Sequence, residues 1–321
     1  MIALERDGLE FRFPEVHEDA VLRVVFQRTL RIPDDGRVHL LPPGLGAFPL
    51  RHVDDFARRV PPAWAEHGGV MLPIHQAEAV WIAFSTVYPM VVKVGAGKVD
   101  AVSGEAWSEA LSRSPKQNYL VVPDQPWLDG YCTDTGVIRQ FVAMRLGAGF
   151  SPEEQLTGKA EVGGIQLQVH PLRREVWLRM LEERDRDRRD RTGWYVSEGH
   201  TPYSAAPDMA LGMGGRMKQE IYEDSRPAGD WDTDQRERCF VHLANSATWR
   251  SITGTKPPTR PPTAAAYRRA GLPWFDFYNE GASPVAGSPT LAALTSITMT
   301  EDVIDQPTLF DAGTGISPER P

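Results

Sequence analysis

The sequence predicts an α+β protein built mainly from short antiparallel β-strands, with few and short helices. Proline and glycine are abundant, with 27 Pro and 28 Gly among 321 residues, which indicates many turns and short elements. Apolar runs such as PMVVKV and GVIRQFVAM are brief, rich in β-branched residues and bounded by turn residues, as is typical of strands. Helical periodicity is confined to a few segments.

The length and composition allow one large domain or two average ones. We expect residues 1–200 to form a β-rich N-terminal lobe that ends in a charged helix or insertion at 180–200. Residues 201–280 are predicted to form a C-terminal α+β lobe, either as a second domain or as part of the same one. Residues 281–321 are rich in Gly, Ser, Pro and Thr and are expected to be a mostly irregular tail.

In the first third of the chain the pattern from 9 to 31 predicts strands, and PDDG at 33–36 predicts a turn. Asp54 is expected to cap a short helix that runs through Arg59 and is stopped by Pro61 and Pro62. Segment 71–85 fits either a strand or a buried helix. The runs on either side of 95–98 predict a hairpin, and 106–112 predicts a short helix.

Further along, strands are predicted at 119–122, 136–146 and 165–170. Ser151, Pro152 and Glu154 match the cap, first and third positions of a helix start, and Gly158 suits its end. Apolar residues at helical spacing predict a helix that begins at 173 and continues into alternating charges up to 191. A strand that passes into a helix is expected at 238–254, with a further helix at 264–270 and a last strand near 291–299.

Charge and composition exclude several classes of partner. The formal net charge of -8 gives no electrostatic reason to approach a nucleic acid or an anionic membrane. The N-terminal residues lack the apolar core of a secretory signal, and no run of 18 apolar residues occurs, so we expect a cytoplasmic protein without membrane segments. Cys132 and Cys239 lie in apolar runs and are expected to be buried thiols.

The familiar cofactor and metal motifs fail on spacing. GAGKV at 95–99 lacks the earlier glycine and the Ser or Thr of a phosphate-binding loop. Asp230, Asp232 and Asp234 begin like a calcium loop, but Gln235 and Val241 replace its glycine and its bidentate glutamate. No HExxH, GxSxG or CxxC occurs. We therefore expect no cofactor and no metal.

Two histidines merit separate predictions. His242 lies among apolar residues and is expected to be a hydrogen-bonded core residue. His75 stands near Glu78, whose carboxylate could belong to a site or could pair with a buried arginine.

One set of polar residues suits a binding site on loops carried by a sheet. Asp124, Asp129 and Glu220 are the carboxylates that could perform acid–base catalysis if they lie roughly 5–10 Å apart. The expected ligand-binding residues are Gln125, Trp127, Arg139, Gln155, Gln166 and Arg216. The competing interpretation makes Trp127 a core residue, the two aspartates turn formers, and the charges a structural network.

Several phrases together carry a resemblance: PDQPWLDG, GVIRQFVAM, EEQLTG, GGIQLQV, GGRMKQEIYED, RCFVHLANS and GLPWFDFY. Through them the chain resembles a family of uncharacterised proteins of bacteria and fungi over roughly residues 25–280, outside the charged insertion and the tail. The resemblance implies no activity, cofactor or catalytic residue.

The absence of compact catalytic motifs favours a non-catalytic binding or scaffold protein that presents its Trp/Asp/Gln loop to a small polar ligand or a partner protein. The alternative is a hydrolase that acts on a polar, carbohydrate-like substrate with paired carboxylates. A third class is a homo-oligomeric assembly component, because many short strands imply free sheet edges.

Overall fold

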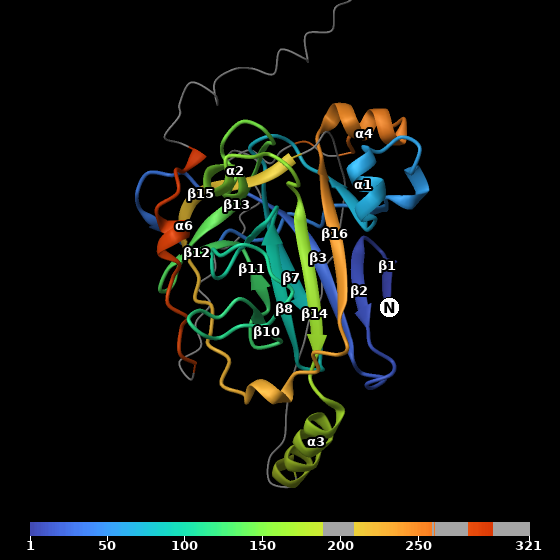
Figure 1. Ribbon diagram of the computed structural model, residues 1–321, viewed down its shortest axis with the longest axis vertical. Coiled ribbons are helices and arrows are strands. Elements are labelled where there is room, and N and C mark those ends of the chain that lie inside the picture. The colour runs from blue at the N-terminus through green and yellow to red at the C-terminus, as the bar shows by residue number, and fades with distance from the viewer. Residues whose placement is uncertain (189–208, 259, 261–281, 298–321) are drawn as a thin grey trace, which may run out of the picture.

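The computed structural model describes residues 1–188, 209–258, 260 and 282–297. In these residues sixteen strands form one continuous hydrogen-bonded sheet, and most of its pairs are antiparallel. The helices are few, and apart from α3 they are short (Figure 1). The predicted predominance of short antiparallel strands with few helices is confirmed.

The strands are β1 (Ile2–Glu5), β2 (Gly8–Arg12), β3 (Val21–Thr29), β4 (Val38–His39), β5 (Arg51–His52), β6 (Val70–Pro73), β7 (Ala79–Ser85), β8 (Met90–Ala96), β9 (Val99–Asp100), β10 (Leu120–Val122), β11 (Trp127–Leu128), β12 (Gly130–Asp134), β13 (Val137–Arg145), β14 (Ile165–Pro171), β15 (Met209–Lys218) and β16 (Glu237–Ala244). The helices are α1 (Pro62–His67), α2 (Pro152–Thr157), α3 (Arg174–Arg188), α4 (Ser246–Thr253) and α6 (Pro289–Ala292), with single 3-10 turns at Asp54–Phe56 and Ala228–Asp230.

The main path of the sheet runs β1-β2-β3-β7-β13-β15-β16-β14-β8-β10. Strand β16 connects its two halves, because it pairs with β15, with β14 and, in parallel, with β6. Figure 1 shows β14 and β16 side by side along the length of the molecule. Strands β15 and β16, which lie in the predicted C-terminal lobe, thus pair with strands from the first 188 residues.

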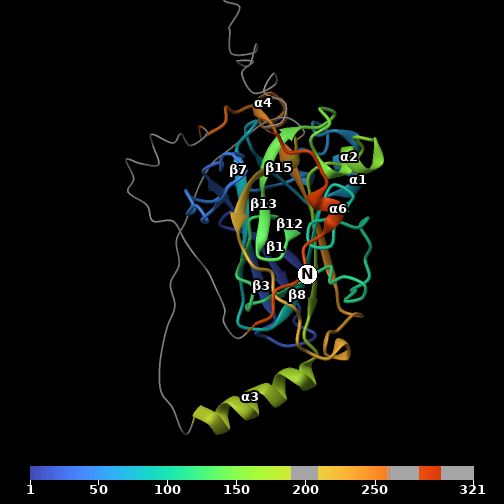
Figure 2. The same cartoon turned by 90° about the vertical axis from the view of Figure 1, so that its left-hand side faces the viewer.

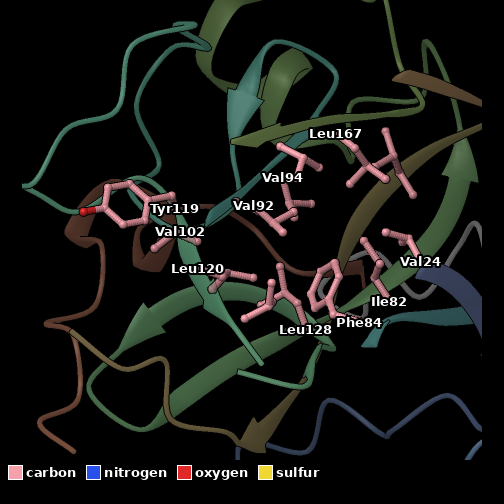
Figure 3. Close-up of a cluster of buried hydrophobic side chains, with 14 of the residues drawn as sticks. Val24, Ile82, Phe84, Val92, Val94, Val102, Tyr119, Leu120, Leu128 and Leu167 are labelled. Carbon is pink, nitrogen blue, oxygen red and sulfur yellow. The ribbon is translucent and has the colours of Figure 1, made fainter. Parts of the chain in front are cut away.

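The main core forms where side chains from the two halves of the sheet meet (Figure 3). Burial alternates along β3, so that Leu22, Val24 and Phe26 are fully buried and the residues between them are not. This is the pattern expected of a strand with one solvated face. Val24 of β3 and Phe84 of β7 belong to the same cluster as Val94 of β8 and residues of β10 and β14.

Local sequence chemistry places α2 where it was predicted. The Ser151 hydroxyl accepts a hydrogen bond from the Glu154 N–H, and the Glu154 carboxylate accepts from the Ser151 N–H, which completes a capping box. Pro152 occupies the first helical position, and Gly158 ends the helix with a left-handed φ of 70°. The hairpin between β8 and β9 also turns at Gly97 and Lys98, as predicted.

Three predicted elements are wrong. The predicted helix that begins at Asp54 is a single 3-10 turn at Asp54–Phe56, and this turn has no side-chain cap. Pro62 begins α1 instead of stopping a helix, because proline at the first helical position loses no hydrogen bond. Segment 106–112 is not helical. The described residues of the predicted last strand at 291–299 form no strand, because 291 and 292 end helix α6, which Ser288 caps. The predicted helix at 264–270 lies outside the described residues.

Helix α3 projects from one end of the sheet, opposite α1 and α4 (Figures 1 and 2). The first part of α3 contacts the body, where Val176 and Trp177 are buried and Met180 and Leu181 are partly buried against the core. This agrees with a helix whose apolar residues precede a charged half.

Gly130 is a position at which the sheet has no room for a side chain. A Cβ there would lie 1.9 Å from the backbone oxygen of Arg139 on the neighbouring strand. We expect Gly130→Ala to lower the free energy of unfolding by about 3 kcal/mol, because a backbone collision cannot be relieved by a rotamer change. Urea denaturation followed by circular dichroism measures the loss.

The matched control is Gly229→Ala, since a Cβ at Gly229 meets no atom within 4 Å. This variant should stay within about 0.5 kcal/mol of the parent protein. Equal stability of the two variants would show that strands β12 and β13 separate easily at this point.

Candidate functional site

The predicted loop at 124–129 divides into an exposed part and a buried part. Asp124 is exposed, whereas Gln125 and Asp129 are buried. The Gln125 side-chain amide donates to the Trp127 carbonyl at 3.1 Å and thereby closes the loop on itself. Asp124 and Asp129 therefore sit in opposite environments although five positions separate them.

Asp129 is held by Gln219, a residue outside the predicted site. The Gln219 amide donates to the Asp129 carboxyl at 3.1 Å and to the Trp127 carbonyl at 3.3 Å, while its oxygen accepts from the Asp129 N–H at 3.0 Å. Burial raises the pKa of Asp129 to about 8, even though hydrogen bonds from the Gln219 and Trp127 side chains act in the opposite direction. Asp129 is therefore mainly protonated at neutral pH.

Among the predicted carboxylates, no hydrogen bond or ion pair joins Asp124, Asp129 and Glu220 in the described part of the chain. Glu220 follows β15 and lies beside Gly136 at the turn between β12 and β13.

The predicted arginines, by contrast, do come together. Arg139 on β13 and Arg216 on β15 are direct cross-strand partners, and Arg139 donates to Asp34 at 3.3 Å.

Gln155 and Gln166 lie at two further places. The Gln155 side chain exchanges hydrogen bonds with the backbone of Thr295 and thereby fastens α2 to the segment after α6. Gln166 lies on β14, where its amide donates to the Gly97 carbonyl and its oxygen accepts from Arg238. Gln166 therefore lies at a polar surface of the sheet. It is the one residue of the predicted site that belongs to this surface.

This surface is the outer face of β8, β14 and β16. Lys93, Gln168 and Arg238 form one row across the three strands, because Gln168 is the direct partner of the other two. Their neighbours along each strand, Val94, Leu167 and Cys239, belong to the core cluster on the opposite face. The strand alternation thus gives this part of the sheet a polar outer face of which a large part is buried.

Trp107 covers the row. Its ring lies 5.3 Å from the Lys93 ammonium and 5.6 Å from the centre of the Arg238 guanidinium, so it stacks against two cations. Gly95 makes room for it, since a Cβ at Gly95 would lie 2.5 Å from the indole. We call Lys93, Trp107, Gln168, Arg238 and Phe240 the Trp107 face.

Lys93 is fully buried and pairs with Asp100, at 3.4 Å between ammonium and carboxylate. The other Asp100 oxygen accepts from the N–H groups of Val102 and Ser103 and from the Ser103 hydroxyl. Burial lowers the pKa of Lys93 and raises the pKa of Asp100, while their mutual attraction opposes both shifts. The Lys93 side-chain nitrogen thus lies against the indole and is paired with a buried carboxyl group.

Three buried polar atoms of the Trp107 face have no hydrogen-bond partner among the described residues. They are the indole nitrogen of Trp107, the side-chain oxygen of Gln168 and the Nε of Arg238. Buried polar groups are normally paired, and each exception costs free energy. Two donors and one acceptor thus remain unsatisfied on residues that contact or neighbour one another.

Beyond Arg238 the outer face becomes aromatic. The Arg238 guanidinium lies 4.7 Å from the Phe240 ring, which in turn stacks on exposed His67 at 4.6 Å. Glu109 binds both Arg236 and Arg238 at 2.9 Å.

His242 is buried beside Trp64 and bonds the Gly68 carbonyl at 3.0 Å, and burial lowers its pKa to about 4. The prediction of a hydrogen-bonded core histidine is confirmed.

Glu78 pairs with the buried Arg28 at 3.1 Å and accepts a hydrogen bond from the His75 N–H. Of the two interpretations of Glu78, a partner for a buried arginine is therefore the one observed.

Asp232 accepts hydrogen bonds from the N–H groups of Asp234 and Gln235 and shapes a turn. The described ranges hold no group of three His, Cys, Asp or Glu side chains placed to bind a metal ion. Cys132 and Cys239 are both buried and free.

Comparison with protein-family models, with curated proteins and with solved structures finds no match for this chain. In its described residues no helix is both long and apolar enough to cross a membrane.

Sequence reasoning missed most of the Trp107 face, although two signals point to it. Lys93 interrupts the apolar run MVVKV, and IQLQVH places polar residues at every second position. Both patterns indicate a strand whose outer face is polar but covered.

Proposed function

We propose that the protein binds a small polar ligand without transforming it, and that the Trp107 face contacts this ligand. The observation that supports this is the group of three buried, unpaired polar atoms on Trp107, Gln168 and Arg238. A ligand with hydroxyl groups would both donate to the Gln168 oxygen and accept from the two nitrogens. An apolar ring face on the same ligand would suit the indole and Phe240, as in sugar recognition.

These atoms are closed to solvent in the structure, so ligand entry requires the segment from Ser103 to Asn118 to move off the sheet. This movement would also have to break or carry along the Asp100 N–H bond to the Glu105 carbonyl, the Gln117 bond to the Tyr222 carbonyl and the Arg113–Asp224 ion pair. The segment has no helix or long strand, and its ties to the neighbouring sheet include the Trp107 N–H to the Lys98 carbonyl and the Gln168 amide to the Glu109 carbonyl. We expect slow exchange of these amides to quicken on removal of the indole.

The test is a titration with glucose, N-acetylglucosamine and glycerol, followed by tryptophan fluorescence and calorimetry. Trp107→Phe keeps an aromatic ring and removes the N–H donor, and we expect it to weaken sugar binding about 3- to 10-fold. Trp81→Phe is the matched control, because Trp81 also has a buried unpaired indole nitrogen but packs near Trp127. Sugar affinity that is absent in the parent protein, or equal in the two variants, would refute the proposal.

The hydrolase alternative has one observation in its favour. Burial raises the pKa of Asp129 to about 8, and a carboxyl kept protonated at neutral pH is the form that a general acid requires. Release of nitrophenol from 4-nitrophenyl glycosides tests it directly. Turnover that disappears in both Asp124→Asn and Glu220→Gln would support the hydrolase, and no turnover above the buffer rate would end it.

We further propose a cytoplasmic location, supported by the two free cysteines, which suit a reducing compartment. Association of copies through a sheet edge is proposed on the position of β1 and β10 at the two ends of the main strand path. Light scattering at micromolar concentration tests this, and a strictly monomeric mass would count against it.

A further inference from the structure

A second polar site lies where the segment from Leu30 to His39 crosses β13 and β15. Gln140, fully buried, fastens this segment by accepting from the Ile32 N–H at 2.8 Å and donating to the Leu30 carbonyl at 2.9 Å. Strand β4 continues it in parallel beside Arg216 and Met217. The crossing is close, because a Cβ at Gly215 would lie 2.3 Å from the Pro33 carbonyl oxygen.

Three arginines lie on the segments that meet at this crossing. Arg139 and Arg216 are direct partners on β13 and β15, and Arg31 belongs to the crossing segment. All three are partly buried. Like charges directly opposite one another on adjacent strands destabilise a sheet, and partial burial reduces the screening by water.

Among the described residues one carboxylate, that of Asp34, interacts with two of these arginines. Asp34 accepts from Arg139 at 3.3 Å and attracts Arg31, whereas the neighbouring Asp35 is taken by His39 at 2.9 Å. Neither Arg31 nor Arg216 has a hydrogen bond or ion pair with another residue of the described ranges. In the described part of the chain one carboxylate thus faces three arginines, an excess of two positive charges, in a protein whose net charge is -8.

We propose that Arg31, Arg139 and Arg216 bind a phosphate group. Guanidinium forks present paired N–H donors that match phosphate oxygens. The excess of two positive charges over the Asp34 carboxylate equals in size the charge of a phosphate near its dianionic form. The site shares no residue with the Trp107 face, so this proposal does not depend on the proposed function. Asp34 occupies one side of the arginine cluster and competes with the ligand.

Calorimetric titration of the full chain with inorganic phosphate, and separately with glucose 6-phosphate, tests the proposal at constant ionic strength set by chloride. We expect saturable binding of at least one of the two. Tighter binding of glucose 6-phosphate would identify a phosphorylated small molecule as the source, and equal binding would identify free phosphate.

Two variants sharpen the test. Arg216→Gln removes a side chain that makes no hydrogen bond or ion pair with the described residues, so the fold should persist while phosphate affinity falls about tenfold or more. Arg216→Lys should restore part of this affinity. Asp34→Asn removes the competing carboxylate and should raise phosphate affinity, which a merely structural role would not do. Arg250→Gln, on exposed α4, is the control.

No heat of binding from either phosphate compound would overturn the proposal. So would an Arg216→Gln variant that binds like the parent protein, or an Asp34→Asn variant that binds more weakly while its circular dichroism spectrum is unchanged.

Discussion

Lys93→Met should lower the free energy of unfolding at pH 7 by about 3–5 kcal/mol. The substitution keeps the aliphatic volume but leaves Asp100 as an unpaired carboxylate that is 1 % exposed. The remaining hydrogen bonds of Asp100 come from Val102 and Ser103 and do not supply the missing charge. Urea denaturation followed by circular dichroism gives the value.

The double variant Lys93→Met/Asp100→Asn removes both charges and should regain most of the lost stability, because a buried pair can be replaced by neutral groups at little cost. Lys159→Met, at a 66% exposed side chain, is the surface control and should change stability by less than about 0.5 kcal/mol. A single variant as stable as the parent protein would show that Lys93 carries no charge in the folded state.

Asp129 should make the protein less stable as pH rises from about 4 to about 8. The folded state keeps the Asp129 proton up to a pKa of about 8, whereas the unfolded chain releases it near its ordinary value of 3.8. Unfolding therefore releases a proton in this window, and stability falls with increasing pH until the folded carboxyl also ionises. The full effect is roughly 6 kcal/mol as an upper bound.

The measurement compares the parent protein with Asp129→Asn at pH 5, 7 and 9. Because the amide cannot ionise, the variant should gain stability relative to the parent protein across this series. Asp124→Asn, in the same loop but exposed, should leave the pH dependence unchanged. A constant difference between Asp129→Asn and the parent protein at all three pH values would mean that Asp129 has an ordinary pKa in the fold.

The sequence could predict those elements whose cause is local. The capping box of Ser151 and Glu154 and the turn at Gly97 depend on residues within a few positions of one another, and both occur as predicted. The failed helix at 106–112 shows the limit of this reasoning. The helical propensity of this segment is outweighed by the packing of Trp107 over Gly95 and Lys93. No local sequence pattern encodes these contacts.

The candidate sites were harder to predict because strand pairing assembles them from distant segments. Gln168 meets Lys93 on one side and Arg238 on the other, about 70 residues away in each direction. Arg139 and Arg216 were both expected in a site, but their direct pairing follows from the β13–β15 register. The α+β class, the division into lobes and the resemblance to a bacterial and fungal family stay predictions.

The position of β16 sets an order for protein synthesis. A ribosome must translate the first 236 residues before β16 begins, yet β6 and β14 both need it as a neighbour. Until then the nascent chain exposes two strand edges, and β5 and β6 cannot join the growing sheet through β16. We infer that completion of this fold is a late event, and that incomplete chains are the form most in need of chaperones.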